Sequence, residues 1–146
     1  MLPNTQTRSE LTSFQHTTTC LSEPNPNTFY DELTNSLQSQ QFSTKDVFAI
    51  QLALDEAITN AFKHGNRFDA GKRVWVRYRI HTQQAWFQVE DQGSGFQVND
   101  VPDPTDIDFL ERSNGRGVFL MHHYMDSVEY NDMGNIVTLT KQRSNT

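Results

Sequence analysis

The sequence is short of cysteine, of basic residues and of long apolar runs, and each shortage excludes a class of protein. Cys20 is the only cysteine among 146 residues, which rules out a disulfide within the chain and argues against a cysteine zinc site. The 12 Lys and Arg against 18 Asp and Glu give a net charge of -6, whereas binding to nucleic-acid phosphates needs clustered basic residues. No apolar run could span a bilayer and no signal peptide opens the chain, so we predict a cytoplasmic protein without direct contact to nucleic acid or membrane.

The length and the aromatic content are those of a single folded domain. A chain of 146 residues is long enough to bury a real core, and ten Phe and two Trp provide large side chains for it. Residues 1–9 are polar and lack apolar periodicity. We therefore predict a disordered N-terminal tail over residues 1–9 and one domain over residues 10–142.

Apolar periodicity predicts the order strand, helix, helix, strand, strand, helix, strand, strand. The first strand is expected at the edge of a sheet, because its apolar face is thin. The elements are expected at about residues 10–19, 28–40, 44–64, 74–80, 85–90, 118–125, 127–130 and 136–141. Sequential hairpins with helices between them predict an α/β (α+β) two-layer sandwich, in which helices cover one face of a mixed, mostly antiparallel sheet.

Capping residues indicate where the first two helices begin. Asn27 or Thr28 can cap the first helix, and Ser43 or Thr44 can cap the second, because their short polar side chains accept from free N–H groups. Asp46 is favourable in the first turn of the second helix, where the helix dipole is positive. This second helix is the centre of the predicted domain.

The central helix carries a candidate catalytic and metal site. Glu56 and Asn60 are four residues apart, so they lie one turn above each other on a face other than the apolar one. A carboxylate can accept a proton from a hydroxyl, and an amide oxygen suits a Mg²⁺ ion that keeps its other positions for water and phosphate. The alternative is that both are ordinary solvated residues. Gly65 is expected to end the helix by taking the left-handed conformation.

Asp91 follows the second strand of the predicted hairpin and is a candidate ligand contact. An ionised Asp only accepts hydrogen bonds, so it suits an exocyclic amine such as that of adenine. Gly93 and Gly95 allow a ligand to approach the backbone closely. The alternative is an ordinary Asp-x-Gly turn. Residues 97–112, rich in Asp and Pro, follow as a segment whose length is typical of a lid or of disorder.

Gly115 and Gly117 are expected to precede the helix at 118–125. The first N–H groups of a helix are unpaired and carry partial positive charge, which makes an anion site that phosphate commonly occupies. Arg112 and Arg116 flank this position and could pair with phosphate oxygens. By itself the Gly-x-Gly pattern is weak, because it lacks the spacing of a P-loop.

Taken together, Glu-x-x-x-Asn, Asp-x-Gly-x-Gly-Phe and Gly-x-Gly closely resemble the GHKL ATP-binding superfamily. Within it, the chain resembles the anti-sigma factor serine/threonine kinases of bacterial stress-response and sporulation switches. Residues 55–66 resemble the N box of that family, residues 91–96 its G1 box, and residues 111–121 its G2 box. The resemblance runs from about residue 10 to residue 141.

This resemblance implies the Bergerat ATP-binding fold, with ATP and Mg²⁺ as cofactors. Glu56 would be the catalytic base, Asn60 the Mg²⁺ ligand and Asp91 the adenine contact, with the ATP lid between the G1 and G2 boxes. His64, one turn beyond Asn60, could reach the edge of the pocket, although a capping or packing role is the commoner one. The other nucleotide-binding residues that the resemblance implies are Gly93, Gly95, Phe96, Arg112, Gly115, Arg116, Gly117 and Val118.

The implied function is that of an anti-sigma factor with kinase activity. Such proteins sequester a sigma factor, phosphorylate a serine or threonine of a STAS-type anti-anti-sigma protein, and commonly form homodimers. One alternative is a partner-switching module that binds ATP without phosphoryl transfer. Another is the detached ATPase domain of a sensor histidine kinase, which is disfavoured because no phosphoacceptor helix precedes the domain. Asp55 could also exchange roles with Glu56, although it lies about 100° round the helix.

Overall fold

The structure is a computed structural model that describes residues 16–24, 26–93 and 113–144, with the backbone alone over 113–118. Along the chain the elements are β1 (Thr17–Leu21), α2 (Asn27–Ser39), α3 (Thr44–Asn60), the π-helical turn η1 (Ala61–Gly65), β2 (Val74–Ile80), β3 (Gln84–Asp91), α5 (Ser113–Tyr124), β4 (Ser127–Tyr130) and β5 (Ile136–Gln142). The predicted tail over residues 1–9 and the predicted lid lie outside the described residues, as do Gly95, Phe96 and Arg112.

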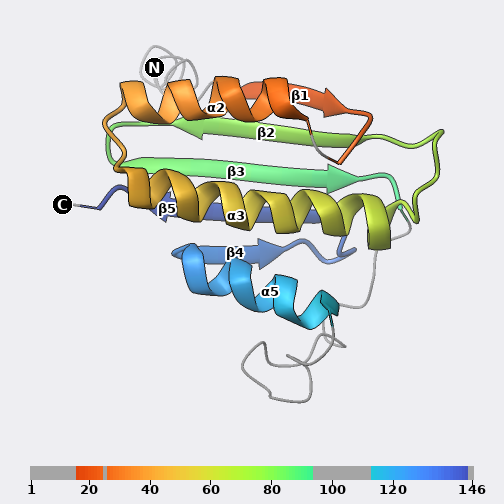
Figure 1. Cartoon of the computed structure of the whole chain (residues 1–146). Helices are drawn as coiled ribbons and strands as arrows, with labels where there is room; N and C mark the ends of the chain where they lie inside the picture. Colours follow the sequence, from red (N-terminus) through yellow and green to blue (C-terminus); the bar gives the residue numbers. More distant parts are fainter. Residues whose placement is uncertain (1–15, 25, 94–112, 145–146) are drawn as a thin grey trace, which may run out of the picture.

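The strands form one sheet in the order β1-β2-β3-β5-β4, and each neighbouring pair is antiparallel. Helices α2, α3 and α5 lie on the same face of this sheet, with α3 between the other two (Figure 1). The predicted two-layer sandwich and the edge position of the first strand are therefore confirmed. Within the described ranges, no helix combines the length and the apolar character needed to cross a membrane.

The core lies between the sheet and the helices, and the strand periodicity explains how it forms. Alternate residues of β2 and β3 are buried, because successive side chains of a strand point to opposite faces. The apolar face of α3 packs onto them, and burying each large side chain contributes about 1.5–3 kcal/mol. The most completely buried of these side chains are Ile50, Leu54, Ile58, Val74, Val76, Phe87 and Val89.

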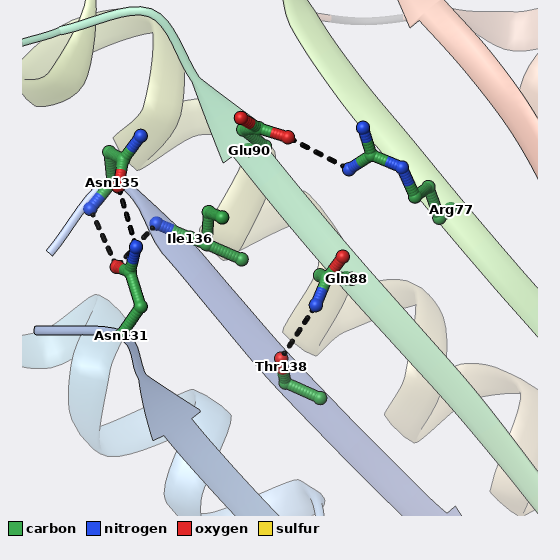
Figure 2. A network of polar contacts seen from close by, with 7 residues as sticks. All are labelled: Arg77, Gln88, Glu90, Asn131, Asn135, Ile136 and Thr138. Carbon is green, nitrogen blue, oxygen red and sulfur yellow. Dashed lines mark hydrogen bonds and ion pairs between the residues drawn. The ribbon is translucent and has the colours of Figure 1, made fainter. Parts of the chain in front are cut away.

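The other face of the sheet carries polar side chains as well as Trp75 and Trp86, and polar pairs cross between its strands. Arg77 of β2 forms an ion pair with Glu90 of β3 at 2.9 Å. The Gln88 amide of β3 donates to the Thr138 hydroxyl of β5 at 3.3 Å. Figure 2 shows both pairs along the strands. This face keeps the polar half of each strand away from the core, as the alternation predicts.

Of the two predicted helix caps, the cap of α2 is wrong and the cap of α3 is confirmed. The predicted cap of α2 is wrong, because Asn27 is already the first helical residue and Pro26 stands at the cap position without a side-chain bond. The proline carbonyl accepts from the Tyr30 N–H at 3.2 Å, which is the first hydrogen bond of the helix. At α3, Ser43 is the cap as predicted, and its hydroxyl accepts from the Asp46 N–H at 3.1 Å.

Asp46 has a second role that its sequence position did not indicate. Its side chain is only 2% exposed, and it accepts hydrogen bonds from both the backbone N–H and the hydroxyl of Ser144 at 2.9 Å. Ser144 follows β5, so this contact joins the last described part of the chain to the start of α3. The far end of the same helix carries the candidate site.

Candidate functional site

Glu56 and Asn60 are placed by the last two turns of α3, and both are partly buried. Helix α5, which begins with the predicted G2 segment, packs directly against α3. In Figure 1 the two helices lie next to each other on the same face of the sheet. The fold therefore brings the helix with the predicted base and metal ligand beside the helix with the predicted phosphate site.

Burial raises the pKa of Glu56, and the negative charge of the neighbouring Asp55 adds to this effect. Removing water from a carboxylate destabilises its charged form, and a nearby like charge does the same. A carboxylate with a raised pKa binds a proton more readily, which suits a general base as long as it is ionised at the working pH. The direction of this shift is compatible with the predicted role of Glu56 as a base.

Asp55, the alternative base, lies near Tyr30 of α2. Burial raises the pKa of the Tyr30 hydroxyl, and the charge of Asp55 raises it further, so this carboxylate lies near α2. Burial also raises the pKa of Asp55 itself. Asp55 therefore lies near α2, whereas the predicted phosphate site is on α5, which also packs against α3, and Glu56 stays the predicted base.

The end of the central helix differs from the regular helix that its periodicity predicts. Ala61–Gly65 form a π-helical turn, in which the Asn66 N–H donates to the Ala61 carbonyl at 2.8 Å. A π turn holds more residues than an α turn, so the residues after Asn60 do not continue the regular α-helical spacing on which the prediction for His64 was based. The His64 side chain is exposed. Loss of water around part of its ring, together with the charge of Lys63, lowers the pKa of His64.

Gly65 ends the helix, but the predicted reason is wrong. Gly65 does not have a positive φ; in the turn that follows, Arg67 at 51° and Phe68 at 57° do. Glycine is required at 65 because a Cβ atom there would overlap the carboxyl group of Asp91. A Cβ atom on Gly93 would likewise overlap the Gly65 carbonyl oxygen. The end of the N box and the start of the G1 box are therefore in direct contact, and two glycines make this contact sterically possible.

Asp91 lies at the end of β3, as predicted, and is only 8% exposed. Its Oδ1 accepts from the Gly93 N–H at 2.8 Å, whereas Oδ2 accepts from none of the described residues. Burial raises the pKa of Asp91 and the charge of Glu90 raises it further, against the lowering effects of the Gly93 hydrogen bond and Lys72. The carboxylate therefore offers a partly desolvated acceptor of the kind that an amine of a ligand would satisfy.

The backbone of Asp91 is held from the opposite side by the turn between β4 and β5. Its N–H donates to the Asn135 carbonyl at 2.9 Å. The Asn131 side chain fixes this turn, because its Oδ1 accepts from the N–H groups of Asn135 and Ile136 at 3.0 Å and its Nδ2 donates to the Asn135 side chain at 2.7 Å. Figure 2 shows this cluster beside the ends of β4 and β5. Position 91 is thus secured by neighbouring chain segments.

Asn66 is a buried residue whose importance the sequence analysis missed. Its side chain is 1% exposed and bonds to the backbone of Arg73 and Gln92. The sequence signal was slight: a polar residue directly after the glycine that ends the helix, in a stretch that looks like an ordinary turn. Its burial follows from the packing of two distant strands, which local periodicity does not reveal.

The G2 segment begins differently from the prediction. Helix α5 starts at Ser113, so Gly115, Arg116, Gly117 and Val118 lie within its first turns and not before it. The unpaired N–H groups of the helix start consequently fall near Ser113 to Gly115, while the Gly117 N–H lies inside the helix. An anion site at this end stays a prediction, moved by about one turn.

The described residues fit a magnesium ion that arrives with a ligand better than a resident metal. Among them, no group of three or more His, Cys, Asp or Glu side chains could hold a metal ion. Mg²⁺ is commonly bound through one or two protein oxygens, with phosphates and water at its other positions. The Asn60 amide, one turn from the Glu56 carboxylate, offers that kind of donor set.

Residues 26–141 match the family described as the histidine kinase-like ATPase domain, which covers most of the chain. The chain belongs to this family. It is 32% identical over 109 residues to a protein of Bacillus licheniformis named serine-protein kinase RsbW, covering 68% of this chain and 67% of the relative. A protein of the same name from Listeria monocytogenes is 30% identical over 110 residues, covering 68% of both chains. An anti-sigma F factor of Clostridium perfringens is 37% identical over 83 residues, 55% of this chain and 59% of that protein.

These relatives confirm the predicted superfamily and its anti-sigma kinase branch. Membership in an ATPase family implies that the chain uses ATP. The roles given to individual residues, Glu56, Asn60 and Asp91 among them, stay predictions that rest on the geometry described above.

Proposed function

We propose that this protein is an ATP-dependent serine/threonine kinase that acts as an anti-sigma factor and phosphorylates a STAS-type anti-anti-sigma protein. The observation that carries the proposal is the contact between Gly65 and Asp91, which joins the helix of Glu56 and Asn60 to the predicted adenine contact. Relatives named serine-protein kinase and anti-sigma F factor support the activity and the partner class. Binding of a sigma factor, homodimer formation and a role in transcription regulation belong to the same proposal.

In this proposal the protein positions the reacting groups and neutralises the charge of the phosphates, because phosphoryl transfer requires little covalent chemistry from the enzyme. Asp91 accepts a hydrogen bond that the exocyclic amine of adenine donates, and the start of α5 binds phosphate oxygens. Asn60 would hold Mg²⁺ through its amide oxygen, and the bound ion would neutralise charge on the phosphates. Glu56 accepts the proton of the serine or threonine hydroxyl as its oxygen bonds to the γ-phosphorus and the bond to the β–γ bridging oxygen breaks, which releases ADP.

The alternative function is a module that binds ATP and its partner without transferring phosphate. The place of Glu56, a partly buried carboxylate one helical turn from Asn60, supports the kinase, because a general base has to lie beside the phosphate-bound metal. The names of the relatives also favour a protein kinase over the detached ATPase domain of a sensor histidine kinase.

The test uses purified protein, γ-labelled ATP, Mg²⁺ and the STAS-type protein of the same organism. Wild-type protein should transfer label to a serine or threonine of that partner. Glu56→Gln, which keeps the size of the side chain, should reduce labelling by about 10²–10⁴-fold, the usual contribution of a general base, while the dissociation constant of ATP changes little. Asp55→Asn is the matched control, because it alters the neighbouring carboxylate that faces α2.

The outcomes separate the two functions. If wild-type protein binds ATP but labels no hydroxyl of any STAS-type partner, the binding module is correct and the kinase is wrong. If Glu56→Gln labels the partner as fast as wild type while Asp55→Asn does not, the two carboxylates exchange roles.

A further inference from the structure

Asn66 is a buried polar side chain to which the proposed mechanism gives no task. Among the described residues, the buried polar or charged side chains are Asp46 at 2%, Asn66 at 1% and Asp91 at 8% exposure. Asp46 joins the chain terminus to α3, and Asp91 is the predicted adenine contact. Burying an amide is unfavourable unless both of its ends are hydrogen-bonded, so the partners of Asn66 explain why it is there.

Both ends of the Asn66 amide bond to backbone, and the partners bond to each other. Its Nδ2 donates to the Arg73 carbonyl at 2.9 Å, and its Oδ1 accepts from the Gln92 N–H at 2.7 Å. The Arg73 N–H in turn donates to the Gln92 Oε1 at 2.6 Å. These three hydrogen bonds form a closed ring, which joins the residue after η1, the residue before β2 and the residue after β3.

One bond of this hydrogen-bond ring holds Gln92, the residue next to Asp91. Holding the Gln92 N–H fixes the peptide that leaves Asp91, and Gly93 then donates its N–H to the Asp91 carboxylate at 2.8 Å. In this position the Asp91 carboxyl group lies against Gly65, the residue directly before Asn66. The same side chain therefore sets both the peptide beyond Asp91 and the end of the helix that contacts its carboxyl group.

We propose that Asn66 is a positioning residue for recognition of the nucleotide base. Its hydrogen-bond ring holds Asp91 where the carboxylate meets the exocyclic amine of adenine. The inference rests on the proposed function only in that Asp91 contacts adenine. It assigns to Asn66 the selection of the base, and it leaves binding of the triphosphate to Asn60 and α5.

The test compares ATP with inosine triphosphate, which carries a carbonyl oxygen in place of the exocyclic amine, in calorimetric titrations with Mg²⁺. Wild-type protein should prefer ATP by about tenfold or more, the value of one hydrogen bond to a charged group. Asn66→Leu has a similar size and no hydrogen bonds, so the preference should fall to within about threefold of parity. The affinity for inosine triphosphate should stay nearly unchanged, because its phosphate contacts remain.

A purely structural role of Asn66 predicts a different result. Partial unfolding would weaken the binding of both nucleotides by the same factor. The ratio of their affinities would then stay as in wild type, and this result would overturn the inference. Ser43→Ala is the matched control, because it removes the cap at the opposite end of α3 and should lower stability without changing the ratio. A loss of selectivity in this control as well would mean that selectivity follows stability, against the inference.

A second variant covers the case in which Asn66→Leu does not fold. Asn66→Ser keeps a small polar group that is too short to bridge both partners, and it can be combined with Asp91→Asn. If Asn66 acts through Asp91, Asn66→Ser should reduce selectivity in the wild-type background and cause no further loss in the Asp91→Asn background. An equal loss in both backgrounds would overturn the inference. If wild-type protein binds no ATP, the proposed function itself fails; if it binds ATP selectively and Asn66→Leu does too, only this inference fails.

Discussion

Glu56 and Asp91 are carboxylates whose pKa values are raised mainly by the same cause, the loss of water around their charged oxygens. A carboxyl group with a raised pKa binds a proton more tightly in the folded protein than in the unfolded one. Such a group stabilises the fold below its unfolded pKa, and this contribution is lost as the pH rises through the folded pKa. The loss of water that raises both pKa values therefore weighs against the ionised forms of these groups, a cost that is common at functional sites.

Gly65 and Gly71 provide a matched pair of glycines for testing the contact with Asp91. A methyl group at Gly65 would overlap the Asp91 carboxyl group, whereas at Gly71 it would only approach the Asp69 Oδ1 to 3.3 Å. Overpacking of a tight contact is typically destabilising by about 1–3 kcal/mol, so Gly65→Ala should lower the unfolding free energy by that amount and weaken ATP binding. Gly71→Ala should change both much less. Urea unfolding and calorimetric titration measure the two quantities. Equal effects at both positions would mean that the Gly65 contact is not special.

At the scale of the elements, α3 carries a stabilising contact at its first turn and the candidate site at its last turns. Its first turn is attached to the end of the chain through Asp46, and its last turns carry Glu56 and Asn60. The π-helical turn then directs the chain toward Asp91. Because the stabilising contact and the candidate site lie at opposite ends of one helix, they should respond to mutation separately.

Asp46→Ala tests this separation. It removes a buried carboxylate that accepts two hydrogen bonds from Ser144, and losing hydrogen bonds to a charged group typically lowers stability by about 1.5–3 kcal/mol. The midpoint of urea unfolding should fall accordingly, while the dissociation constant of ATP for the folded protein stays within about twofold of wild type. Lys45→Ala, at the exposed neighbouring position, is the control. A large loss of ATP affinity in Asp46→Ala would show that the two ends are coupled.

For the whole molecule, the central expectation is that nucleotide binding and folding are linked. The site joins α3, η1, β3 and α5, elements that come from both halves of the sequence. A ligand that binds only the folded protein stabilises it by RT ln(1 + [L]/Kd), which is about 2.7 kcal/mol at a concentration one hundred times Kd.

Thermal unfolding with and without Mg-ATP measures this linkage. Wild-type protein should gain several degrees in Tm, since about 1 kcal/mol shifts the Tm of a domain of this size by roughly 2–8 °C. Asp91→Asn should weaken ATP binding by about 1–3 kcal/mol and reduce the gain correspondingly, because it removes a charge-assisted acceptor. Asp132→Asn, an exposed residue of the turn between β4 and β5, should behave as wild type. A full gain in Asp91→Asn would contradict the adenine contact.

The sequence by itself determined the layers of the fold, the buried faces of its helices and strands, and the segments that carry the candidate site. These depend on side-chain periodicity and on local chemistry, such as the Ser43 cap and the alternation along β2 and β3. The start of α5 at Ser113 and the π turn after Asn60 differ from the prediction, because backbone hydrogen bonding at a helix end responds to its surroundings as well as to residue type.

Only the tertiary structure decided how the segments meet. The reason for Gly65 is the Asp91 carboxyl group, which is 26 positions away in the chain, and the reason for burying Asn66 is a ring of bonds to residues 73 and 92. Contacts of this kind arise from the pairing of strands and the packing of helices on them, so no local pattern of residues announces them. Which residues are present follows from the sequence, but which of them hold one another in place follows from the fold.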